Sequence, residues 1–565
     1  MCDPVIQIEK LTYSYPGRSE STLVDVNLRV DRGEFVLLTG PTGCGKSTLL
    51  KTVNGLIPHL LGGALAGRVR VDGIETCEAG MASLSQKVGL VFQNPDDQIF
   101  STMVLDEVAF GPENLALPRE EIRRRVARVL EAVGLEGLEH RSTQMLSGGQ
   151  KQRLVVASVL SMAPDILLLD EPFSQLDPRG AREVLEVVRR LNGKGMTVVL
   201  VEHRIHEVID AATRMVVMDQ GRILLDGSPR EVFEHGHVLG RLGLRIPDSV
   251  VFSWKMGFDE VALNLEEVER KLDGQRSIAP RAVKAVPGAE PMRCRPGGEA
   301  VLEAEGVSFG YQRKAGRILD EVSLGIQRGE MVSLMGNNGS GKSTLLLHFA
   351  GLLKPWVGVV RVLGRDLRKS NPWELAGEVG MVFQNPTLML FNDTVRQELE
   401  FGPRALRKDG ETIERTVSEI ARTLGVAPFE GDNPLALSGG QRLRVALGAV
   451  LSMRPRVVLL DEPTSGQDKG NCDSLLQHLQ TLARNGSTVL FSTHDIDAAV
   501  RWSNRLVVMN GGRIVADGPP GEVVRRAEVM AQACLRPPLS YEIGRLMHIE
   551  AFTAEELMES VPCFA

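Results

Sequence analysis

Two segments of the chain combine glycines, a lysine and a serine at a spacing suited to holding the phosphates of a nucleotide. In the pattern Gly-x-x-x-x-Gly-Lys-Ser, the glycines let backbone N–H groups turn toward an anion, and the following helix adds partial positive charge. The first loop comprises Gly40, Pro41, Thr42, Gly43, Cys44, Gly45, Lys46, Ser47 and Thr48. The second comprises Gly336, Asn337, Asn338, Gly339, Ser340, Gly341, Lys342, Ser343 and Thr344. We therefore predict two ATP sites, with Lys46 and Lys342 reaching the β- and γ-phosphates.

Two apolar runs end in an aspartate followed by a glutamate, at Asp170-Glu171 and Asp461-Glu462. The aspartates follow the loop lysines at similar distances, 170 − 46 = 124 and 461 − 342 = 120 residues. Next to a phosphate loop, an aspartate supports Mg²⁺, and a glutamate orients or deprotonates the attacking water. The sequence thus predicts Glu171 and Glu462 as bases, and Ser47, Asp170, Ser343 and Asp461 as Mg²⁺ ligands.

These motifs belong to an internal repeat. The offset is 296 residues at the loop lysines (342 − 46) and 291 at the two glutamates (462 − 171), so the first half holds five extra residues. They fall around residues 57–67. Units of nearly 300 residues are too long for a solenoid repeat and fit two globular domains.

Short β-branched runs that alternate with amphipathic stretches must position these residues. Buried strands are predicted at residues 35–39, 166–170, 197–201 and 215–218, and helices at 46–55 and 119–133. Because the second half repeats this order, the fold class is α/β, with a mostly parallel sheet twice over.

The domain limits follow from composition. We predict domain 1 with its C-terminal extension at residues 3–273, a Pro/Gly-rich linker at 274–299, and domain 2 with its extension at 300–565. Each extension should end in a small helix, at 261–272 and at 551–560.

Composition excludes several functions. A net charge of −7 and 4% aromatic residues argue against a nucleic-acid-binding protein. The seven cysteines form no Cys-x-x-Cys pair, which disfavours zinc ribbons and iron–sulfur clusters and favours a reducing compartment. No run of about 18 apolar residues occurs, so work at a membrane would require docking onto another subunit.

The order of the motifs resembles that of ATP-binding-cassette ATPases. Each half carries a phosphate loop, a glutamine, the pentapeptide Leu-Ser-Gly-Gly-Gln (146–150 and 437–441), the tripeptide Asp-Glu-Pro and a histidine, in that order. The resemblance implies two tandem P-loop NTPase domains, each with a RecA-like core, an antiparallel β subdomain and a helical subdomain.

The resemblance also implies roles for single residues. Adenine would stack on Tyr15 and Tyr311, the γ-phosphate would meet His203 and His494, and Gln93 and Gln384 would sense Mg²⁺ and a transmembrane partner. Asp177 and Asp468 match the aspartate that faces the other half of the dimer. Each pentapeptide would complete the ATP site of the other half, through Ser147, Gly148, Gly149 and Gln150 or through Ser438, Gly439, Gly440 and Gln441.

A finer resemblance is to energy-coupling-factor importers, which take up vitamins and transition-metal ions. It rests on residues 91–100 and 107–114, and on 382–386 and 400–403 in the second half. It implies transmembrane coupling subunits, a separate substrate-binding membrane subunit, and a peripheral position on the cytoplasmic face of the cell membrane. Candidate contacts beside the grooves at Gln93 and Gln384 are Asp96, Asp97 and Gln98.

Two alternatives remain open at this stage. One is a soluble twin-cassette ATPase of the translation-factor or DNA-repair type, although the short linker and the equal 54-residue spacings (147 − 93 and 438 − 384) favour an importer. The other is the fused ATPase of a sugar or peptide importer, which would share the chemistry and differ in partner.

Two differences between the halves bear on the sites. The histidine lies in Glu202-His203-Arg204 in the first half and in Thr493-His494-Asp495 in the second, so turnover at the two sites need not be equal. Cys44 replaces the serine found at Ser340, and the loop N–H groups together with Lys46 would favour a reactive thiolate there, against a packed, inert thiol as the alternative.

Overall fold

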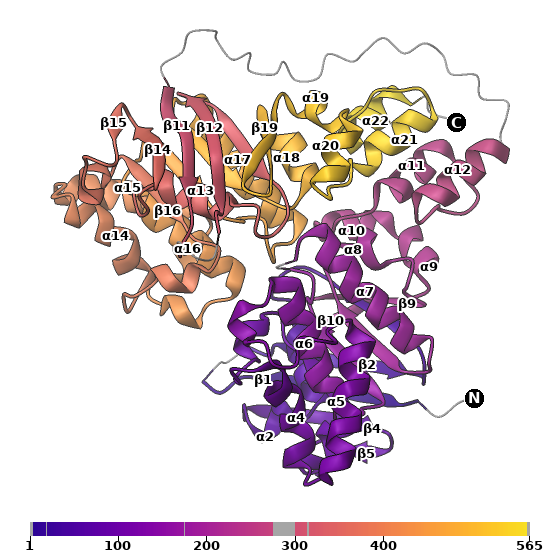
Figure 1. The fold of residues 1–565 in the computed structure, drawn as a ribbon. Helices are drawn as coiled ribbons and strands as arrows, with labels where there is room; N and C mark the ends of the chain where they lie inside the picture. The colour runs from indigo at the N-terminus through magenta and orange to yellow at the C-terminus, as the bar shows by residue number, and fades with distance from the viewer. Residues whose placement is uncertain (1–3, 18–19, 175, 275–299, 313–315, 562–565) are drawn as a thin grey trace. The chain divides into compact units, whose positions relative to one another are not determined.

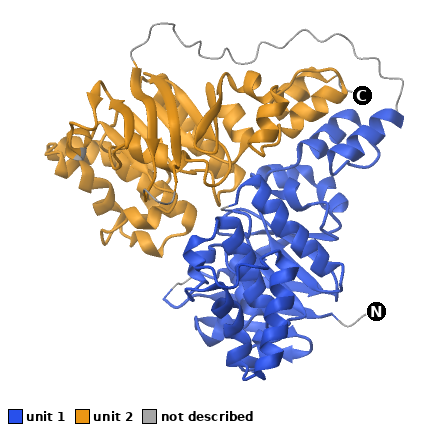
Figure 2. Ribbon diagram, in the orientation of Figure 1, with its two compact units in different colours: residues 1–275, 564–565 blue, residues 276–563 orange. Residues whose placement is uncertain are grey.

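The structure is a computed structural model that describes residues 4–17, 20–174, 176–274, 300–312 and 316–561. These residues fall into two compact units, one ending at residue 274 and the other starting at residue 300 (Figure 2). Most of the predicted linker, from 275 to 299, lies outside the described residues. The domain limits given above therefore stay predictions, and each unit is described by itself.

The first unit is built around a six-stranded sheet whose strands are parallel except at one edge (Figure 1). In spatial order the strands are β10 (Arg222–Gly227), β9 (Arg214–Asp219), β3 (Phe35–Thr39), β8 (Thr197–Val201), β7 (Ile166–Asp170) and β6 (Val88–Val91). β3, β7 and β8 are buried at every position, because the two faces of the sheet pack into two different cores. On β3, for instance, Phe35 and Leu37 join one core while Val36 and Leu38 join the other. The predicted strands and parallel sheet are confirmed.

A second, antiparallel sheet shares one of these cores. Its order is β2 (Leu23–Val30), β1 (Ile6–Ser14), β4 (Ala64–Val71) and β5 (Ile74–Glu75). Alternate residues of β1 are buried, such as Ile6, Ile8, Leu11 and Tyr13. They form a core together with residues of the parallel sheet, so the antiparallel sheet rests on the phosphate-loop side of the unit.

Helices complete the first unit. The helical subdomain packs α4 (Val104–Asn114) and α5 (Arg119–Val133) against α6 (Gly148–Leu160). Around the sheets lie α1 (Lys46–Val53), α2 (Leu56–His59), α3 (Met81–Ser85), α7 (Pro178–Asn192) and α8 (Ile205–Val208). The C-terminal extension holds α9 (Pro229–Glu234), α10 (Gly236–Arg241), α11 (Asp248–Met256) and α12 (Leu265–Gly274).

The second unit repeats this architecture. Its large sheet runs β16 (Val379–Val382), β17 (Val457–Leu460), β18 (Thr488–Ser492), β13 (Met331–Met335), β19 (Arg505–Asn510) and β20 (Arg513–Gly518). Its antiparallel sheet runs β12 (Leu319–Gln327), β11 (Ala300–Phe309), β14 (Val357–Val362) and β15 (Arg365–Asp366). Its helices are α13 (Lys342–Phe349), α14 (Val395–Ala405), α15 (Gly410–Thr423), α16 (Gly439–Leu451), α17 (Lys469–Arg484), α18 (Ile496–Trp502), α19 (Pro520–Val524), α20 (Ala527–Gln532), α21 (Leu539–Leu546) and α22 (Ala554–Ser560). The predicted duplication of an α/β domain is confirmed.

Three predicted helices begin or end at other residues than expected. α1 ends at Val53, because Gly55 adopts a left-handed backbone (φ 82°) from which the short α2 starts. α12 begins at Leu265, where the Asn264 side chain accepts a hydrogen bond from the N–H of Glu267. α22 begins after Thr553, which forms a capping box with Glu556.

Among the described residues, every helix is too short or too polar to cross a bilayer.

Candidate functional site

The two phosphate loops have nearly the same conformation. In the first, the Lys46 ammonium donates hydrogen bonds to the carbonyl oxygens of Gly40 and Pro41, both at 2.9 Å. In the second, Lys342 donates to Gly336 at 2.7 Å and to Asn337 at 3.1 Å. Each lysine is buried at the first residue of the helix that follows its loop, so its charge and the helix N-terminus are held at the same place. This is the arrangement expected of an anion-binding loop.

The first glycine of each loop is required by a close approach. Gly40 has φ 153°, and a Cβ atom there would lie 2.1 Å from the carbonyl oxygen of Met218 on β9. Gly336 has φ 145°, and its Cβ would lie 2.1 Å from the carbonyl oxygen of Met509. The loops therefore pass directly against a strand of the sheet, where only glycine fits.

In the first unit, the predicted Mg²⁺ ligands come together at the end of β7. The Ser47 hydroxyl donates a 3.0 Å hydrogen bond to the Asp170 carboxylate. Burial, and then the neighbouring Glu171 charge, raise the pKa of Asp170 to about 6. A hydroxyl and a carboxylate oxygen side by side suit a hard cation, and a carboxylate that is costly to ionise gains from a positive charge beside it.

Glu171 follows directly and has an uncommon backbone. Its φ is 47°, in the left-handed region that residues other than glycine and asparagine rarely adopt. One carboxylate oxygen accepts a 2.8 Å hydrogen bond from the Gln93 amide, and the other lies 3.1 Å from Nε2 of His203. The three predicted catalytic residues of this half are thus in contact, although they come from three different segments.

The second unit repeats this cluster with changes. Glu462 also has a left-handed backbone (φ 52°), and its carboxylate lies 3.0 Å from Nε2 of His494. The same ring nitrogen lies 3.1 Å from the Asn338 side chain of the phosphate loop. Asp461 accepts a 2.6 Å hydrogen bond from Ser492 on the neighbouring strand, at the place where the first half has Val201. Gln384 is exposed. The two sites therefore share their residues and differ in their hydrogen bonds.

The pentapeptide Leu-Ser-Gly-Gly-Gln begins a helix in each unit, α6 and α16. The Ser147 hydroxyl accepts from the N–H of Gln150, and the Gln150 side chain accepts from the N–H of Ser147 at 3.0 Å. Ser438 and Gln441 make the same capping box in the second unit. The serine and glutamine thus fix the start of the helix, and the two glycines between them leave its N-terminus open to an anion.

The remaining family positions lie close to these elements. The Tyr15 hydroxyl is 3.1 Å from that of Thr48 on α1, and the Tyr311 hydroxyl is 3.5 Å from that of Thr344 on α13. Asp177 and Asp468 cap α7 and α17, each by accepting a hydrogen bond from the backbone N–H three residues on. Their roles in stacking on adenine and facing the other half stay predictions.

The reactive-thiolate interpretation of Cys44 is not supported by its surroundings. The thiol is 5% exposed, and its burial raises its pKa more strongly than Lys46, with Nζ 3.8 Å from Sγ, lowers it. A buried thiol with a raised pKa holds little of the nucleophilic thiolate at neutral pH. Cys44 is a packed residue of the core beneath the antiparallel sheet.

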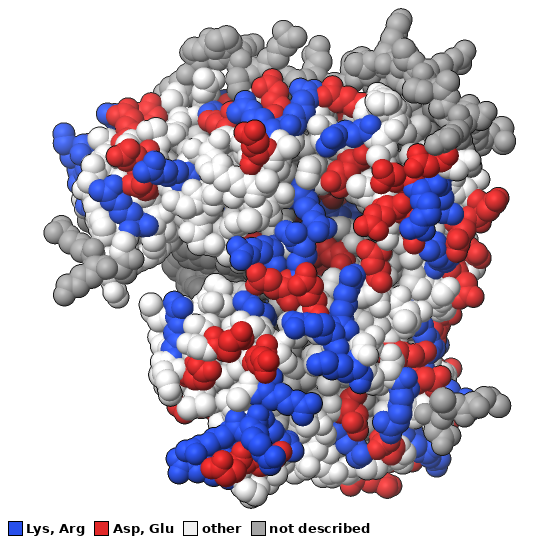
Figure 3. Space-filling model, turned by 45° about the vertical axis from the view of Figure 1, so that its right-hand side comes forward, with Lys and Arg blue, Asp and Glu red and all other residues white. Residues whose placement is uncertain are grey.

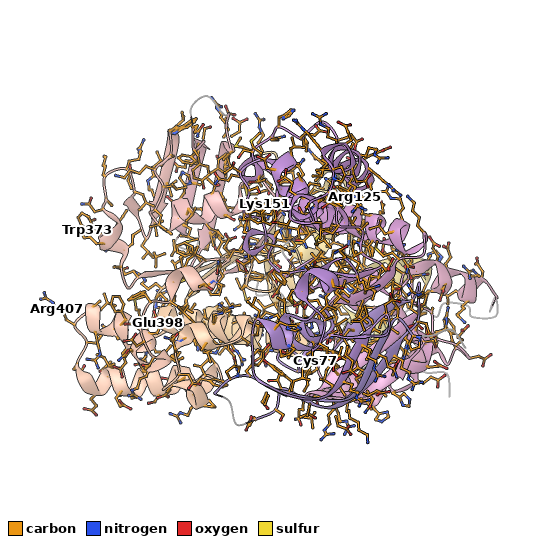
Figure 4. All side chains as sticks on the ribbon, turned by 90° about the horizontal axis from the view of Figure 1, so that it is seen from below. Cys77, Arg125, Lys151, Trp373, Glu398 and Arg407 are labelled. Carbon is orange, nitrogen blue, oxygen red and sulfur yellow. The ribbon has the colours of Figure 1, made fainter. Side chains whose placement is uncertain are left out.

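Alkylation should separate Cys44 from the exposed Cys77 (Figure 4). With iodoacetamide at pH 7, we expect Cys77 to be modified at least about tenfold faster than Cys44, because burial and a raised pKa both slow the reaction of Cys44. Mass spectrometry of the two cysteine peptides over time measures both rates in one sample. Equal rates would restore the reactive-thiolate interpretation.

Two buried glutamates near the glutamine loops were missed by the sequence analysis. Glu107 accepts hydrogen bonds from the backbone N–H groups of Phe100 and Ser101, at 3.2 and 2.8 Å. Glu398 does the same for Phe391 and Asn392, at 3.0 and 2.9 Å. Figure 4 shows Glu398 among the helices, whereas Arg407 projects away from them. The two glutamates could have been found from the sequence, because they are separated by the 291-residue offset of the repeat (398 − 107).

Each of these glutamates holds an exposed aromatic pair in place. Phe100 and Phe110 meet edge to face with centroids 4.2 Å apart, and they are 59% and 45% exposed. Phe391 and Phe401 are 4.8 Å apart and are 64% and 49% exposed. Each pair lies just past the glutamine loop of its unit, at matching positions in the two halves.

Gln98 is half-buried and uses both ends of its amide within its own unit, and its role as a contact for a membrane subunit stays a prediction. Its amide oxygen accepts from the N–H of Phe92, and its amide nitrogen donates to the carbonyl of Leu90, both at 2.9 Å. It therefore ties the following turn to β6. Asp96 and Asp97 are exposed, and Asp96 pairs with Lys151 of α6 at 2.6 Å.

Comparison with known proteins places this geometry in a family. A family model described as ABC transporter matches residues 23–174 and 319–465. An ABC transporter ATP-binding protein of Methanosarcina mazei is 46% identical over 564 residues, covering 99% of this chain and 96% of the relative. Another, from Caldanaerobacter subterraneus subsp. tengcongensis, is 36% identical over 566 residues, covering 99% of both. The solved structure of cbiO1 from Clostridium perfringens, described as part of the ABC transporter complex cbiONQ, is 36% identical over 43% of this chain and 96% of its own, with a TM-score of 0.38.

Proposed function

The chain belongs to the ABC transporter family of ATP-binding proteins, which are ATPases, and we propose that it drives an importer of the energy-coupling-factor type for a vitamin or a transition-metal ion. The family model covers both halves, so the chain carries two ATPase domains. Support for the importer type comes from the sequence phrases at residues 91–100 and 107–114.

The observation that carries the proposal is the exposed aromatic pair beside each glutamine loop. Phenylalanine exposed by more than 40% and fixed by a buried glutamate is typical of a surface that another protein covers. Because the pairs occur at matching positions in the two halves, we propose that each receives a segment of a transmembrane coupling subunit. That subunit would join the chain to a separate substrate-binding membrane protein, at the cytoplasmic face of the membrane.

The charge distribution supports a protein partner over a polyanion. On the face drawn in Figure 3, basic and acidic side chains are interspersed. With a net charge of −7, the chain has no general attraction to nucleic acid or to anionic lipid.

We infer how the residues of one site act on ATP. Lys46 exchanges its two carbonyl partners for phosphate oxygens, and the loop N–H groups bind the remaining charge. Mg²⁺, when bound, neutralises phosphate charge, and Ser47, Asp170 and Gln93 would hold it. Glu171, aligned by Gln93, takes the proton of the attacking water, and His203 contacts the γ-phosphate.

Removal of an aromatic pair tests the docking surface. In the full chain we expect Phe100→Ala with Phe110→Ala to lower co-purification with membrane proteins by more than about 30-fold, because truncating a buried anchor costs about 2 kcal/mol or more. Basal ATPase activity should stay within about twofold, because both rings are largely exposed and the hydrogen bonds of Glu171 come from Gln93 and His203. Quantitative mass spectrometry of material purified from native membranes measures the loss.

The matched control is Leu224→Ala, which removes another exposed apolar side chain (45%) from β10 of the same unit. It should co-purify as the unaltered chain does. Undiminished co-purification of the phenylalanine variant would refute the docking surface. Co-purification of the unaltered chain with ribosomes or DNA at physiological salt would instead favour a soluble twin-cassette ATPase.

A further inference from the structure

The backbones of His203 and His494 are held by different groups, although the two histidines occupy matching positions in the two halves. In the second unit, the backbone N–H of His494 donates to the Glu462 carboxylate at 3.2 Å. In the first unit, the N–H of His203 donates to Glu202 at 2.8 Å. The same Glu202 oxygen also accepts from the N–H of Arg204 at 3.0 Å. In the first unit, the backbone N–H of the histidine is therefore bound by Glu202 and not by the glutamate that is the proposed base.

Glu202 is buried, and only one of its two carboxyl oxygens accepts hydrogen bonds in the described part of the chain. It is 3% exposed, and within the described part of the chain no group donates a hydrogen bond to its other oxygen. In the second unit the matching residue is Thr493, whose hydroxyl lies 2.8 Å from that of Thr464. The first unit has Phe173 where the second has Thr464 (464 − 291), and a phenyl ring offers no hydroxyl. An ionisable group has therefore replaced a neutral hydrogen-bonded pair.

We propose that Glu202 is a positioning residue for ATP hydrolysis at the first site, and that its ionisation tightens the loop that carries His203. An ionised carboxylate accepts backbone hydrogen bonds more strongly than a neutral one. When Glu202 is ionised, the N–H groups of His203 and Arg204 are held firmly; when it is protonated, they are held loosely.

The charges around Glu202 place its ionisation near neutral pH. Burial is the largest cause and raises the pKa to about 7; Arg204 lowers it, and Glu207 and Glu171 raise it. On the side of β3, the N–H of Glu202 donates to the carbonyl oxygen of Leu38 at 3.3 Å, and the Leu38 side chain is uncharged. A rise of the pKa above the usual carboxyl value means that the proton stays bound until the pH approaches 7 and is then lost.

Ionisation of Glu202 should raise the rate of ATP hydrolysis at the first site for two reasons. Ionisation strengthens the hydrogen bonds that position His203, and its negative charge makes the nearby Glu171 a stronger proton acceptor. Turnover at the first site should therefore rise as the pH increases through about 7. The second site has Thr493 and should lack this step.

The test compares pH–rate profiles of the full chain, of Glu202→Gln and of Glu202→Thr, each from pH 5.5 to 8.5. Glutamine can accept both backbone hydrogen bonds but does not titrate, and threonine is the residue of the second unit. We expect the unaltered chain to gain roughly fivefold in rate across pH 7, corresponding to about 1 kcal/mol, and both variants to lack this step. Thr493→Val, which removes a non-titrating hydroxyl at the matching place, should leave the shape of the profile unchanged.

A direct readout of the proton accompanies the kinetics. The infrared difference between the unaltered chain and Glu202→Gln should contain a protonated carboxyl band that disappears with a midpoint near pH 7; Asp170 is present in both and cancels. A purely structural role would lower the rate of Glu202→Gln equally at every pH. That result, or an infrared difference without a titrating band, would overturn the proposal.

Discussion

Replacing Glu171 or Glu462 with glutamine should lower ATP hydrolysis at the altered site by about 10²–10⁴-fold and leave ATP binding intact. Glutamine keeps the shape of the side chain and can still meet the Gln93 amide, which now bonds the Glu171 carboxylate at 2.8 Å. It cannot accept a proton from the attacking water. Steady-state hydrolysis rates, together with the affinity for a fluorescent ATP analogue, separate the two effects.

Glu186→Gln is the matched control, because Glu186 is an exposed glutamate on α7 of the same unit. It should hydrolyse ATP at the unaltered rate. If Glu171→Gln, Glu462→Gln and the double variant all matched the control, these glutamates would not be the bases.

Introducing a methyl group at the first glycine of a loop should weaken nucleotide binding at that loop. In Gly40→Ala or Gly336→Ala, the new Cβ would stand 2.1 Å from a carbonyl oxygen of the neighbouring strand, and a strand backbone cannot move aside without displacing the sheet. Overpacking of this kind costs typically 1–3 kcal/mol, so we expect roughly 5- to 150-fold weaker binding at one site. Titration calorimetry should show the number of tight sites per chain fall from two to one.

Gly80→Ala controls for the loss of a glycine as such. Gly80 has φ −67°, and a Cβ there would have no atom within 4 Å. It should bind nucleotide as the unaltered chain does. Two tight sites in Gly40→Ala would mean that the loop does not approach β9 in solution.

The sequence predicted best where a local pattern has one structural solution. Five-residue apolar runs at 35–39 and 166–170 form strands with these bounds, and the helix at 119–133 ends at Gly134, whose left-handed backbone stops it. Within each unit, the phosphate loop lies close to the acid pair of the same unit, as expected, because the carboxyl ends of parallel strands meet at one edge of the sheet. The late starts of α12 and α22 depended on capping side chains that the apolar pattern does not reveal.

Features that depend on how distant segments pack together could not be predicted from the sequence. Lys46 lies two residues from Cys44 in the sequence, but burial in the core raises the pKa of Cys44 more than Lys46 lowers it. The hydrogen bonds of the Gln98 amide to Leu90 and Phe92 could likewise not be predicted, because they depend on how the chain folds back onto β6. The left-handed backbone of Glu171 and the unequal anchoring of the two histidines arise from long-range packing, which no short motif encodes.

The capping boxes of α6 and α16 have a consequence for the thermodynamics of nucleotide recognition. Immobilising a rotamer-rich side chain during binding costs about 0.5–1.5 kcal/mol, mostly as lost entropy. The serine and glutamine of each pentapeptide are already fixed by hydrogen bonds to their own backbone when the unit folds. Each pentapeptide is thus preorganised, and little configurational freedom would remain to be lost on binding a phosphate, the role that the family resemblance implies. Ser147→Ala or Ser438→Ala would shift that ordering from the folding step to the binding step.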